Sequence, residues 1–331
     1  MPSEKTPSGI KHRAGKSEIT RFNGSRYRMT DAHLHVLNFR QEMPDPQSLV
    51  RAMDRCGVEK AVIFGLPVVK IWAEFDREAP DYYLSSDSRC YYYSLTDVMV
   101  HRFVNTLPKK QQHRFYPLFC GFNPVDKFAI RDVERIYNMF PGFWRGIGEI
   151  LLRHDDLTAL TYGDTPRINH KALYPIFEFA GEKKLPVLVH HNISSVANPH
   201  YPVYVFELEE VLRDFPNTTM VFAHCGISRR INVPFYYKMI ERLLGQYPNL
   251  HIDISWIILD EVICPSGIPD KNWVRLLKKY SGRCCLGSDL VTRFERLGIE
   301  LSRYDPLLDM LGEEAVLDIC TGTAEKLYGK Q

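Results

Sequence analysis

The chain has 331 residues, of which 42 are lysine or arginine and 40 are aspartate or glutamate, so its formal net charge is only +2. This balance argues against a protein that binds nucleic acid through bulk positive charge. The longest apolar run, residues 61–69, is far shorter than the roughly 20 residues of a membrane-spanning helix, and residues 1–28 lack the apolar core of a signal peptide. We therefore expect a cytoplasmic protein that acts on a small molecule, binds neither nucleic acid nor membrane, and could form homo-oligomers.

Residues 1–27 are rich in lysine, arginine, serine and glycine and lack hydrophobic periodicity, which predicts a flexible N-terminal tail. Over residues 28–331, short apolar runs alternate with amphipathic stretches. Eight of these runs are apolar on both faces, as parallel strands covered on both sides are. They end near His35, Val68, Asn123, Glu149, His190, His224, Ser255 and Asp289. Eight cysteines without a CxxC pair exclude a zinc ribbon and indicate reduced, buried thiols.

Helices are expected between these strands, where apolar residues recur at i, i+3 and i+4. The clearest such stretches are residues 48–57, 132–140, 203–215, 234–247 and 272–280. Successive strand–helix units without a break in composition predict an α/β protein, a closed (β/α)8 TIM barrel formed by residues 28–331 as a single catalytic domain. An open, doubly wound sheet is the alternative, but no GxGxxG motif follows the first strand.

Two intervals are longer than a strand–helix unit needs. Residues 70–96 contain Trp72 and five tyrosines, and residues 153–170 follow the fourth predicted strand. Because barrels build their sites at the C-terminal ends of strands, the aromatic segment could form a lid over an organic substrate. A packed surface loop or a subunit contact is the alternative.

Histidines and carboxylates recur at the predicted strand ends. His33 and His35 are two residues apart, so on a strand both point to the same face. In a parallel barrel the C-terminal strand ends converge on one mouth, which would bring together His33, His35, Glu149, His190, His191, His224 and Asp289. Imidazoles and carboxylates with open positions suit Zn²⁺ or another divalent ion such as Mn²⁺.

Four ordered motifs resemble the amidohydrolase superfamily: Asp31-Ala-His-Leu-His, Leu185-Pro-Val-Leu-Val-His, Phe222-Ala-His-Cys-Gly and Leu286-Gly-Ser-Asp. The sequence looks closest to the amidohydrolase-related (amidohydrolase 2) branch of metal-dependent hydrolases. That branch also contains decarboxylases related to aminocarboxymuconate semialdehyde decarboxylase. The resemblance covers roughly residues 28–329 and implies a metal-dependent TIM-barrel hydrolase.

Carried over to this sequence, the resemblance implies that His33, His35 and His190 bind the metal. It implies that His224 polarises the substrate or binds a second ion, and that Asp289 contacts both metal and water. Strand parity alone does not choose between His190 and His191; the family's histidine directly follows the apolar run, which favours His190. Glu149 resembles the glutamate of two-metal members and could bridge two ions, support a ligand or bind substrate.

The implied reaction is hydrolysis of an amide, lactone or ester. A divalent ion can lower the pKa of bound water to about 7, while Asp289 transfers its proton and His224 polarises a carbonyl. One alternative is a metal-dependent, non-oxidative decarboxylase of the aminocarboxymuconate semialdehyde type, and another is a catalytically silent metal-binding barrel. Arg229 could hold a substrate carboxylate and Trp256 could wall an apolar pocket; the alternatives are a solvated loop residue and core filler.

Overall fold

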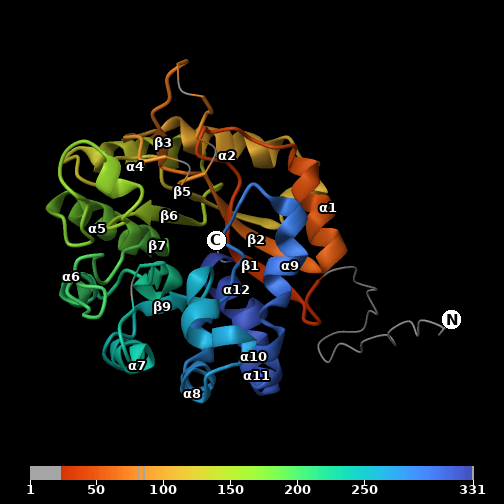
Figure 1. The fold of residues 1–331 in the computed structure, drawn as a ribbon. Coiled ribbons are helices and arrows are strands. Elements are labelled where there is room, and N and C mark those ends of the chain that lie inside the picture. The colour runs from red at the N-terminus through yellow and green to blue at the C-terminus, as the bar shows by residue number, and fades with distance from the viewer. Residues whose placement is uncertain (1–23, 76, 81, 85, 231, 330–331) are drawn as a thin grey trace.

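Parallel strands form the centre of the molecule and helices surround them (Figure 1). The computed structural model describes residues 24–329 apart from 76, 81, 85 and 231. The sheet has the order β10-β9-β8-β7-β6-β5-β2-β1-β11. Its strands are β1 (Met29–His35), β2 (Val58–Phe64), β5 (Phe115–Phe119), β6 (Gly146–Leu151), β7 (Val187–His190), β8 (Met220–Phe222), β9 (Leu250–Asp253), β10 (Cys284–Cys285) and β11 (Leu290–Val291).

One stretch of chain, residues 284–292, joins the two ends of this sheet. Its first part, β10, pairs with β9, and its last part, β11, pairs with β1. Between them the Ala32 N–H donates to the Leu286 carbonyl, and the Asp289 N–H donates to the His33 carbonyl, both at 2.9 Å. The sheet is thus closed through a single broken strand, which confirms the predicted α/β TIM barrel.

Helices follow the strands and cover the outside of the barrel (Figure 1). Asp45 caps the start of helix α1, where its side chain accepts the Gln47 N–H, and Gly57 follows the last helical residue with a φ of 69° that suits glycine. Four further predicted helices are present as α4, α6, α7 and α8. The α-helices of the described residues are α1 (Pro46–Cys56), α2 (Leu95–Asn105), α3 (Lys109–Gln112), α4 (Ala129–Met139), α5 (Tyr174–Lys183), α6 (Val205–Asp214), α7 (Tyr236–Gln246), α8 (Lys271–Lys279), α9 (Leu297–Ser302), α10 (Asp305–Asp309), α11 (Glu313–Leu317) and α12 (Thr323–Tyr328).

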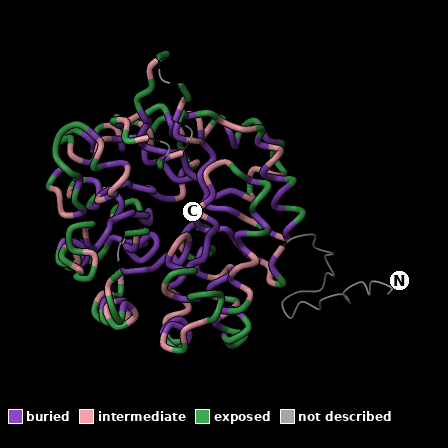
Figure 2. The backbone as a smooth tube through the Cα atoms, viewed as in Figure 1, coloured by how far each residue is buried: buried purple, intermediate pink, exposed green. Residues whose placement is uncertain are grey.

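The strands are buried on both faces, as Figure 2 shows for the centre of the molecule. Val187 and Val189 of β7 pack in the layer between sheet and helices, whereas Leu188 belongs to a second cluster inside the barrel. Ala324 and Tyr328 of α12 join this inner cluster. All eight cysteines are buried and none forms a disulfide. Two apolar layers therefore account for the continuous apolar runs in the sequence.

The second strand ends earlier than its sequence predicts. β2 ends at Phe64, and Val68, the predicted strand end, begins β3 (Val68–Lys70), which pairs antiparallel with β4 (Cys90–Tyr92). The intervening Pro67 lacks the N–H that a continued parallel ladder would need. The long aromatic segment is therefore a hairpin insertion, and it stands out from the barrel at the top of Figure 1.

Of the predicted N-terminal tail, residues 1–23 lie outside the described residues. Its last part contacts the barrel: the Tyr27 hydroxyl donates to Asp309 of α10 at 2.7 Å, and the Arg26 side chain pairs with Asp305 at 3.2 Å. No helix among the described residues combines the length and the hydropathy that crossing a bilayer requires.

Candidate metal centre

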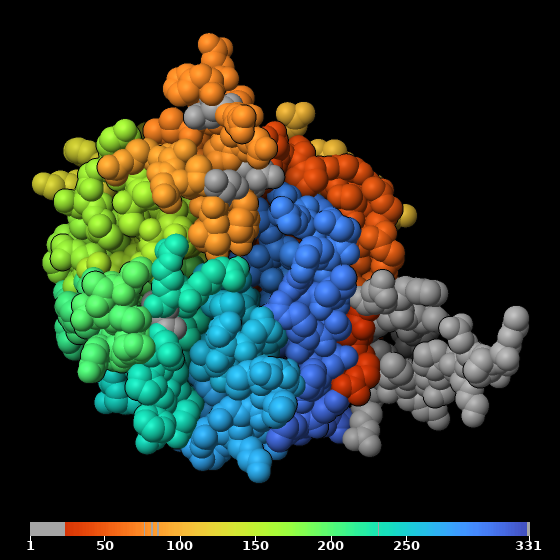
Figure 3. All heavy atoms as spheres, in the orientation of Figure 1, coloured from red at the N-terminus to blue at the C-terminus, as the bar shows by residue number. Residues whose placement is uncertain are grey.

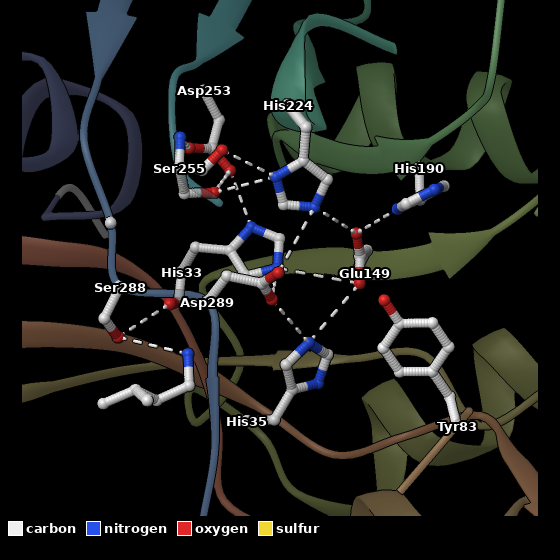
Figure 4. A network of polar contacts seen from close by, with 12 residues as sticks. His33, His35, Tyr83, Glu149, His190, His224, Asp253, Ser255, Ser288 and Asp289 are labelled. Carbon is white, nitrogen blue, oxygen red and sulfur yellow. Dashed lines mark hydrogen bonds and ion pairs between the residues drawn. The ribbon is translucent and has the colours of Figure 1, made fainter. Parts of the chain in front are cut away.

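Six of the predicted side chains meet at the C-terminal ends of the strands (Figure 4). Their nitrogen and oxygen atoms form three overlapping groups, in each of which three ligand atoms lie within 4.8 Å of one another. These groups are His33 with His35 and Glu149, His33 with His224 and Asp289, and Glu149 with His190 and His224. Residues from five strand ends thus converge, as the barrel geometry predicts.

Glu149 lies between two pairs of histidines. Its Oε2 is 3.6 Å from His33 Nε2 and 3.5 Å from His35 Nε2. Its Oε1 is 3.2 Å from His190 Nδ1 and 3.6 Å from His224 Nε2. Asp289 approaches the first pair, with Oδ1 at 3.3 Å from His33 Nε2 and 3.5 Å from His35 Nε2. The Glu149 carboxylate therefore faces both pairs, one oxygen to each.

Asp253, at the end of β9, supports two of these histidines from behind. Its Oδ2 accepts the His33 Nδ1–H at 2.6 Å and the Ser255 hydroxyl at 2.9 Å. The Ser255 carbonyl in turn accepts the His224 Nδ1–H at 3.1 Å. Because both acceptors lie at Nδ1, this nitrogen carries a hydrogen in each ring, and Nε2 is left to bind a proton or a metal ion.

The other two histidines are oriented in the same way. His35 Nδ1 donates to the Gly65 carbonyl at 2.9 Å, which leaves Nε2 facing Glu149. His190 uses the opposite nitrogen: Nε2 donates to the Asn192 side-chain oxygen at 3.2 Å, so Nδ1 faces Glu149. All four imidazoles thus direct toward a common centre the nitrogen that these supporting hydrogen bonds leave free.

The electrostatics of the cluster favour a cation. Burial alone would raise the pKa of Glu149, but His33 and the hydrogen bonds from His190 and His224 hold it well below its usual range. The pKa of Asp289 is likewise lowered, because the charges of His33 and His224 outweigh the effect of burial. Burial would lower the pKa of His33, but Glu149, Asp253 and Asp289 raise it. The two carboxylates therefore stay ionised and stabilise a positive charge among the histidines.

These residues fit a divalent metal ion. His33 Nε2 is fully buried and has no hydrogen-bond partner among the described residues, a state that buried polar atoms rarely show. Imidazole nitrogens and carboxylate oxygens, with their far sides held by hydrogen bonds, are the donor set that zinc and related first-row ions prefer. The side chains of His33, His35, His190 and His224 are at most 5% exposed.

The backbone around the centre is strained. His224, Trp256 and Asp289 all have φ between 51° and 62°, a left-handed conformation that costs free energy for residues other than glycine. Gly148, before Glu149, has φ of 135°, and a Cβ there would lie 2.4 Å from the Leu188 carbonyl. Such outliers cluster at functional sites because the surrounding structure holds the side chains in place.

His190, the last residue of β7, and the residue that follows it, His191, point in opposite directions, as successive residues of an extended chain do. His190 faces the cluster, whereas His191 Nε2 lies 3.4 Å from Glu207 of α6. Glu207 also receives two hydrogen bonds from Arg153, at 2.7 and 2.8 Å. His191 therefore packs between the sheet and α6, outside the cluster.

Arg229 and Trp256 lie together at the mouth of the barrel. Trp256 lines the cavity above the cluster, and its ring centroid is 5.0 Å from that of His224. Arg229 stacks on Trp256 at 5.2 Å and donates from Nε to the Tyr83 hydroxyl at 2.7 Å. The structure thus places Arg229 against the hairpin insertion. It is absent from the described residues that line the cavity.

Sequence reasoning missed three residues of the site. Asp253 is an acidic residue inside an apolar run, a signal obscured because the strand was expected to continue to Ser255. Asn192 directly follows the His190-His191 pair. His154 lines the cavity, where its ring centroid lies 4.6 Å from that of His190. Burial, and after it the neighbouring His190, lowers the pKa of His154 well below its usual value. The one feature of the sequence that pointed to His154 was its place in the long interval of residues 153–170, after the fourth predicted strand.

A TIM barrel with four histidines and two carboxylates at its strand ends has the architecture of the metal-dependent barrel enzymes. In agreement, the family model for amidohydrolases matches residues 30–330, and the chain belongs to this family. This confirms the resemblance found in its motifs and places the chain among metal-dependent hydrolases and decarboxylases. No curated protein matches the sequence.

Solved structures show the same fold at low identity. The chain is similar to 4-oxalomesaconate hydratase from Rhodopseudomonas palustris, with 15% identity, TM-score 0.56, and coverage of 91% of this chain and 95% of that chain. It is also similar to 2,6-dihydroxybenzoate decarboxylase from Rhizobium, with 12% identity, TM-score 0.53, and coverage of 91% of this chain and 98% of that chain. An amidohydrolase from Burkholderia multivorans with bound zinc is similar at 12% identity and TM-score 0.54, with coverage of 92% of this chain and 100% of that chain.

Proposed function

We propose that this protein is a metal-dependent hydrolase with a two-ion centre bridged by Glu149. The observation that carries the proposal is the position of Glu149, whose two carboxylate oxygens face different histidine pairs at 3.2–3.6 Å. Centres with two ions roughly 3.5–4 Å apart are used by hydrolytic enzymes to hold both the attacking and the leaving oxygen. A carboxylate between two imidazole pairs suits such a centre.

The ligands divide into two sets. His33, His35 and Asp289 would hold one ion together with Glu149 Oε2, and His190 and His224 would hold the other together with Glu149 Oε1. Zn²⁺ is the first candidate, because it takes nitrogen and oxygen ligands and keeps an open position in catalytic sites. The zinc bound in the Burkholderia amidohydrolase supports this choice. Mn²⁺ is the alternative.

When bound, the ions would lower the pKa of a water molecule and polarise a substrate carbonyl. Asp289 would act as the general base: its Oδ1 lies beside His33 and His35, and its Oδ2 is 3.9 Å from His224. His33 and His224 keep Asp289 ionised by lowering its pKa, and Oδ2 would take a proton from the attacking water and return it to the leaving group. Trp256 and Tyr83 line the cavity above the site.

Hydrolysis is favoured over the decarboxylase alternative by the cavity lining. A decarboxylation substrate carries a carboxylate, and none of the described residues that line the cavity is a lysine or arginine able to hold one. We therefore propose hydrolysis of an amide, lactone or ester of a small organic molecule, with decarboxylation as the second outcome to be tested.

Metal stoichiometry tests the two-ion centre. Protein reconstituted with Zn²⁺ and freed of excess ion is expected to hold about two equivalents, and Glu149→Gln about one, because the bridging charge is lost. Glu210→Gln is the matched control, because Glu210 lies on α6 and bonds Asn169 away from the centre. One equivalent in the wild type would refute the two-ion proposal, and less than about 0.2 would refute any metal requirement.

A substrate screen separates the three functions. Lactones, phenyl esters and N-acyl amides report hydrolysis, and aromatic carboxylates report release of CO₂. Hydrolysis by loaded wild type but not by Asp289→Asn is the expected result. Release of CO₂ without hydrolysis would establish the decarboxylase instead, and loaded protein that turns over neither class would be a metal-binding barrel without catalysis.

A further inference from the structure

The cavity above the candidate metal centre has charged ligands only at its floor. Glu149 and Asp289 form the floor together with three of the histidines, and the walls include Phe39, Leu151 and Trp256. Its volume of about 70 Å³ corresponds to about five water molecules. None of the described residues that line it is a lysine or arginine. A charged group of a ligand at the walls would therefore lose its hydration without gaining a partner, which is costly.

Arg229, the cation expected from the sequence to hold a substrate carboxylate, is occupied elsewhere. Its Nε donates to the Tyr83 hydroxyl at 2.7 Å, its Nη2 lies 3.4 Å from the Tyr82 hydroxyl, and its guanidinium covers the Trp256 ring. Tyr82 and Tyr83 belong to the hairpin insertion. Figure 3 shows this orange segment meeting the teal and cyan segments of the chain over the middle of the molecule. Arg229 thus fastens the insertion over the cavity.

His154 is a wall residue that can direct a ligand by a neutral hydrogen bond. Its Nδ1 accepts the Asp156 backbone N–H at 3.2 Å, so this nitrogen carries no hydrogen and Nε2 is the N–H donor. Its ring centroid lies 4.6 Å from that of His190, with the two planes tilted by 30°, and the ring meets the Tyr83 ring edge-on at 5.7 Å. These contacts fix the plane of the ring at the cavity wall. His154 is therefore an oriented, uncharged donor.

We propose that the site takes a small, uncharged ester or lactone with a flat ring, which packs against Tyr83 and Trp256 and accepts a hydrogen bond from His154 Nε2. Aromatic walls with a few oriented polar groups are typical of pockets for such molecules. The inference rests on the proposed hydrolase function. It departs from the expectation that Arg229 binds a substrate carboxylate, since Arg229 holds Tyr83 in place instead.

A matched pair of esters tests this substrate class. Phenyl acetate and 4-acetoxybenzoate share the ester and the ring and differ in one carboxylate. With Zn²⁺-loaded protein, kcat/KM is expected to be about tenfold or more higher for phenyl acetate, since the carboxylate has no partner at the walls. Arg229→Met is expected to leave this ratio unchanged. Equal or faster hydrolysis of 4-acetoxybenzoate, or selective loss of that activity in Arg229→Met, would overturn the proposal.

The role of His154 has its own readout. His154→Phe keeps the ring but removes the donor, so KM for phenyl acetate is expected to rise about two- to tenfold with little change in kcat, the effect of one neutral hydrogen bond. His113→Phe, at an exposed position, is the control and should change neither constant. An unchanged KM in His154→Phe would refute the assignment.

Calorimetric binding separates the substrate class from the reaction. Phenol is expected to bind the loaded protein more tightly than 4-hydroxybenzoate, and His154→Phe should weaken the binding of phenol. Tighter binding of 4-hydroxybenzoate would overturn the proposal whether or not an ester is hydrolysed. Preferential binding of phenol without hydrolysis of any ester would support the ligand class and refute the hydrolase function.

Discussion

Replacing Asp253 with asparagine tests whether a carboxylate behind His33 sets the metal affinity. Asp253 accepts the His33 Nδ1–H at 2.6 Å, and both residues are at most 1% exposed. Asparagine retains an acceptor and the side-chain shape but removes the charge. Because a hydrogen bond to a charged group contributes about 1.5–3 kcal/mol and a neutral one about 0.5–1.5 kcal/mol, the change should cost about 1–2 kcal/mol.

This cost corresponds to about a five- to thirtyfold rise in the dissociation constant for Zn²⁺. The upper part of this range overlaps the roughly 10–100-fold loss of affinity that follows when such supporting residues are replaced. Competition with a chromophoric chelator at fixed pH measures the constant. Thermal unfolding of the metal-free protein checks that the barrel is intact. Asp54→Asn is the control, because Asp54 is exposed and pairs with Arg114, which is not part of the centre.

The contrary result is an Asp253→Asn protein that folds normally and binds Zn²⁺ within about twofold of the wild type. That result would mean that the Asp253 carboxylate neither orients His33 nor strengthens its donation to the metal. A weaker affinity that Asp54→Asn reproduces would also contradict it, since the effect would then follow from net charge alone.

Three further predictions follow from the same structure. Asp289→Asn should abolish turnover at unchanged thermal stability, and activity near wild type would contradict its role in proton transfer. Gly287→Ala should lower the melting temperature and the zinc occupancy, because the added Cβ would lie 2.7 Å from the His33 N and Cβ atoms. Gly312→Ala is the control, because a Cβ added there would meet no atom within 4 Å. Burial raises the pKa of Asp97 to about 7 against the hydrogen bonds from Cys120 and Gly121. The folded protein then holds a proton that the unfolded chain releases near pH 4. Its unfolding free energy, relative to that of Asp97→Asn, should therefore fall as the pH rises from about 4 to 7. Denaturant unfolding measures this difference, and a difference independent of pH would refute the prediction.

The sequence by itself determined the barrel and the strand ends at which polar residues gather. Continuous apolar runs at regular spacing are enough to identify buried parallel strands, because each such strand must be covered on both faces. The spacing of His33 and His35 determined that they share a face, since side-chain direction alternates along a strand. The end of β2 was misplaced, because Val68 continues the apolar pattern while pairing in a different sheet.

Only the tertiary structure decided how these residues meet. The choice between His190 and His191 depends on which face of β7 lines the barrel, and both faces are apolar in sequence. The position of Glu149 between two histidine pairs, the support of His33 by Asp253, and the contact of Arg229 with Tyr83 join residues 41 to 220 positions apart. Local pattern carries no information about such pairs, because their distances are set by the closure of the barrel and the packing of the insertion across it.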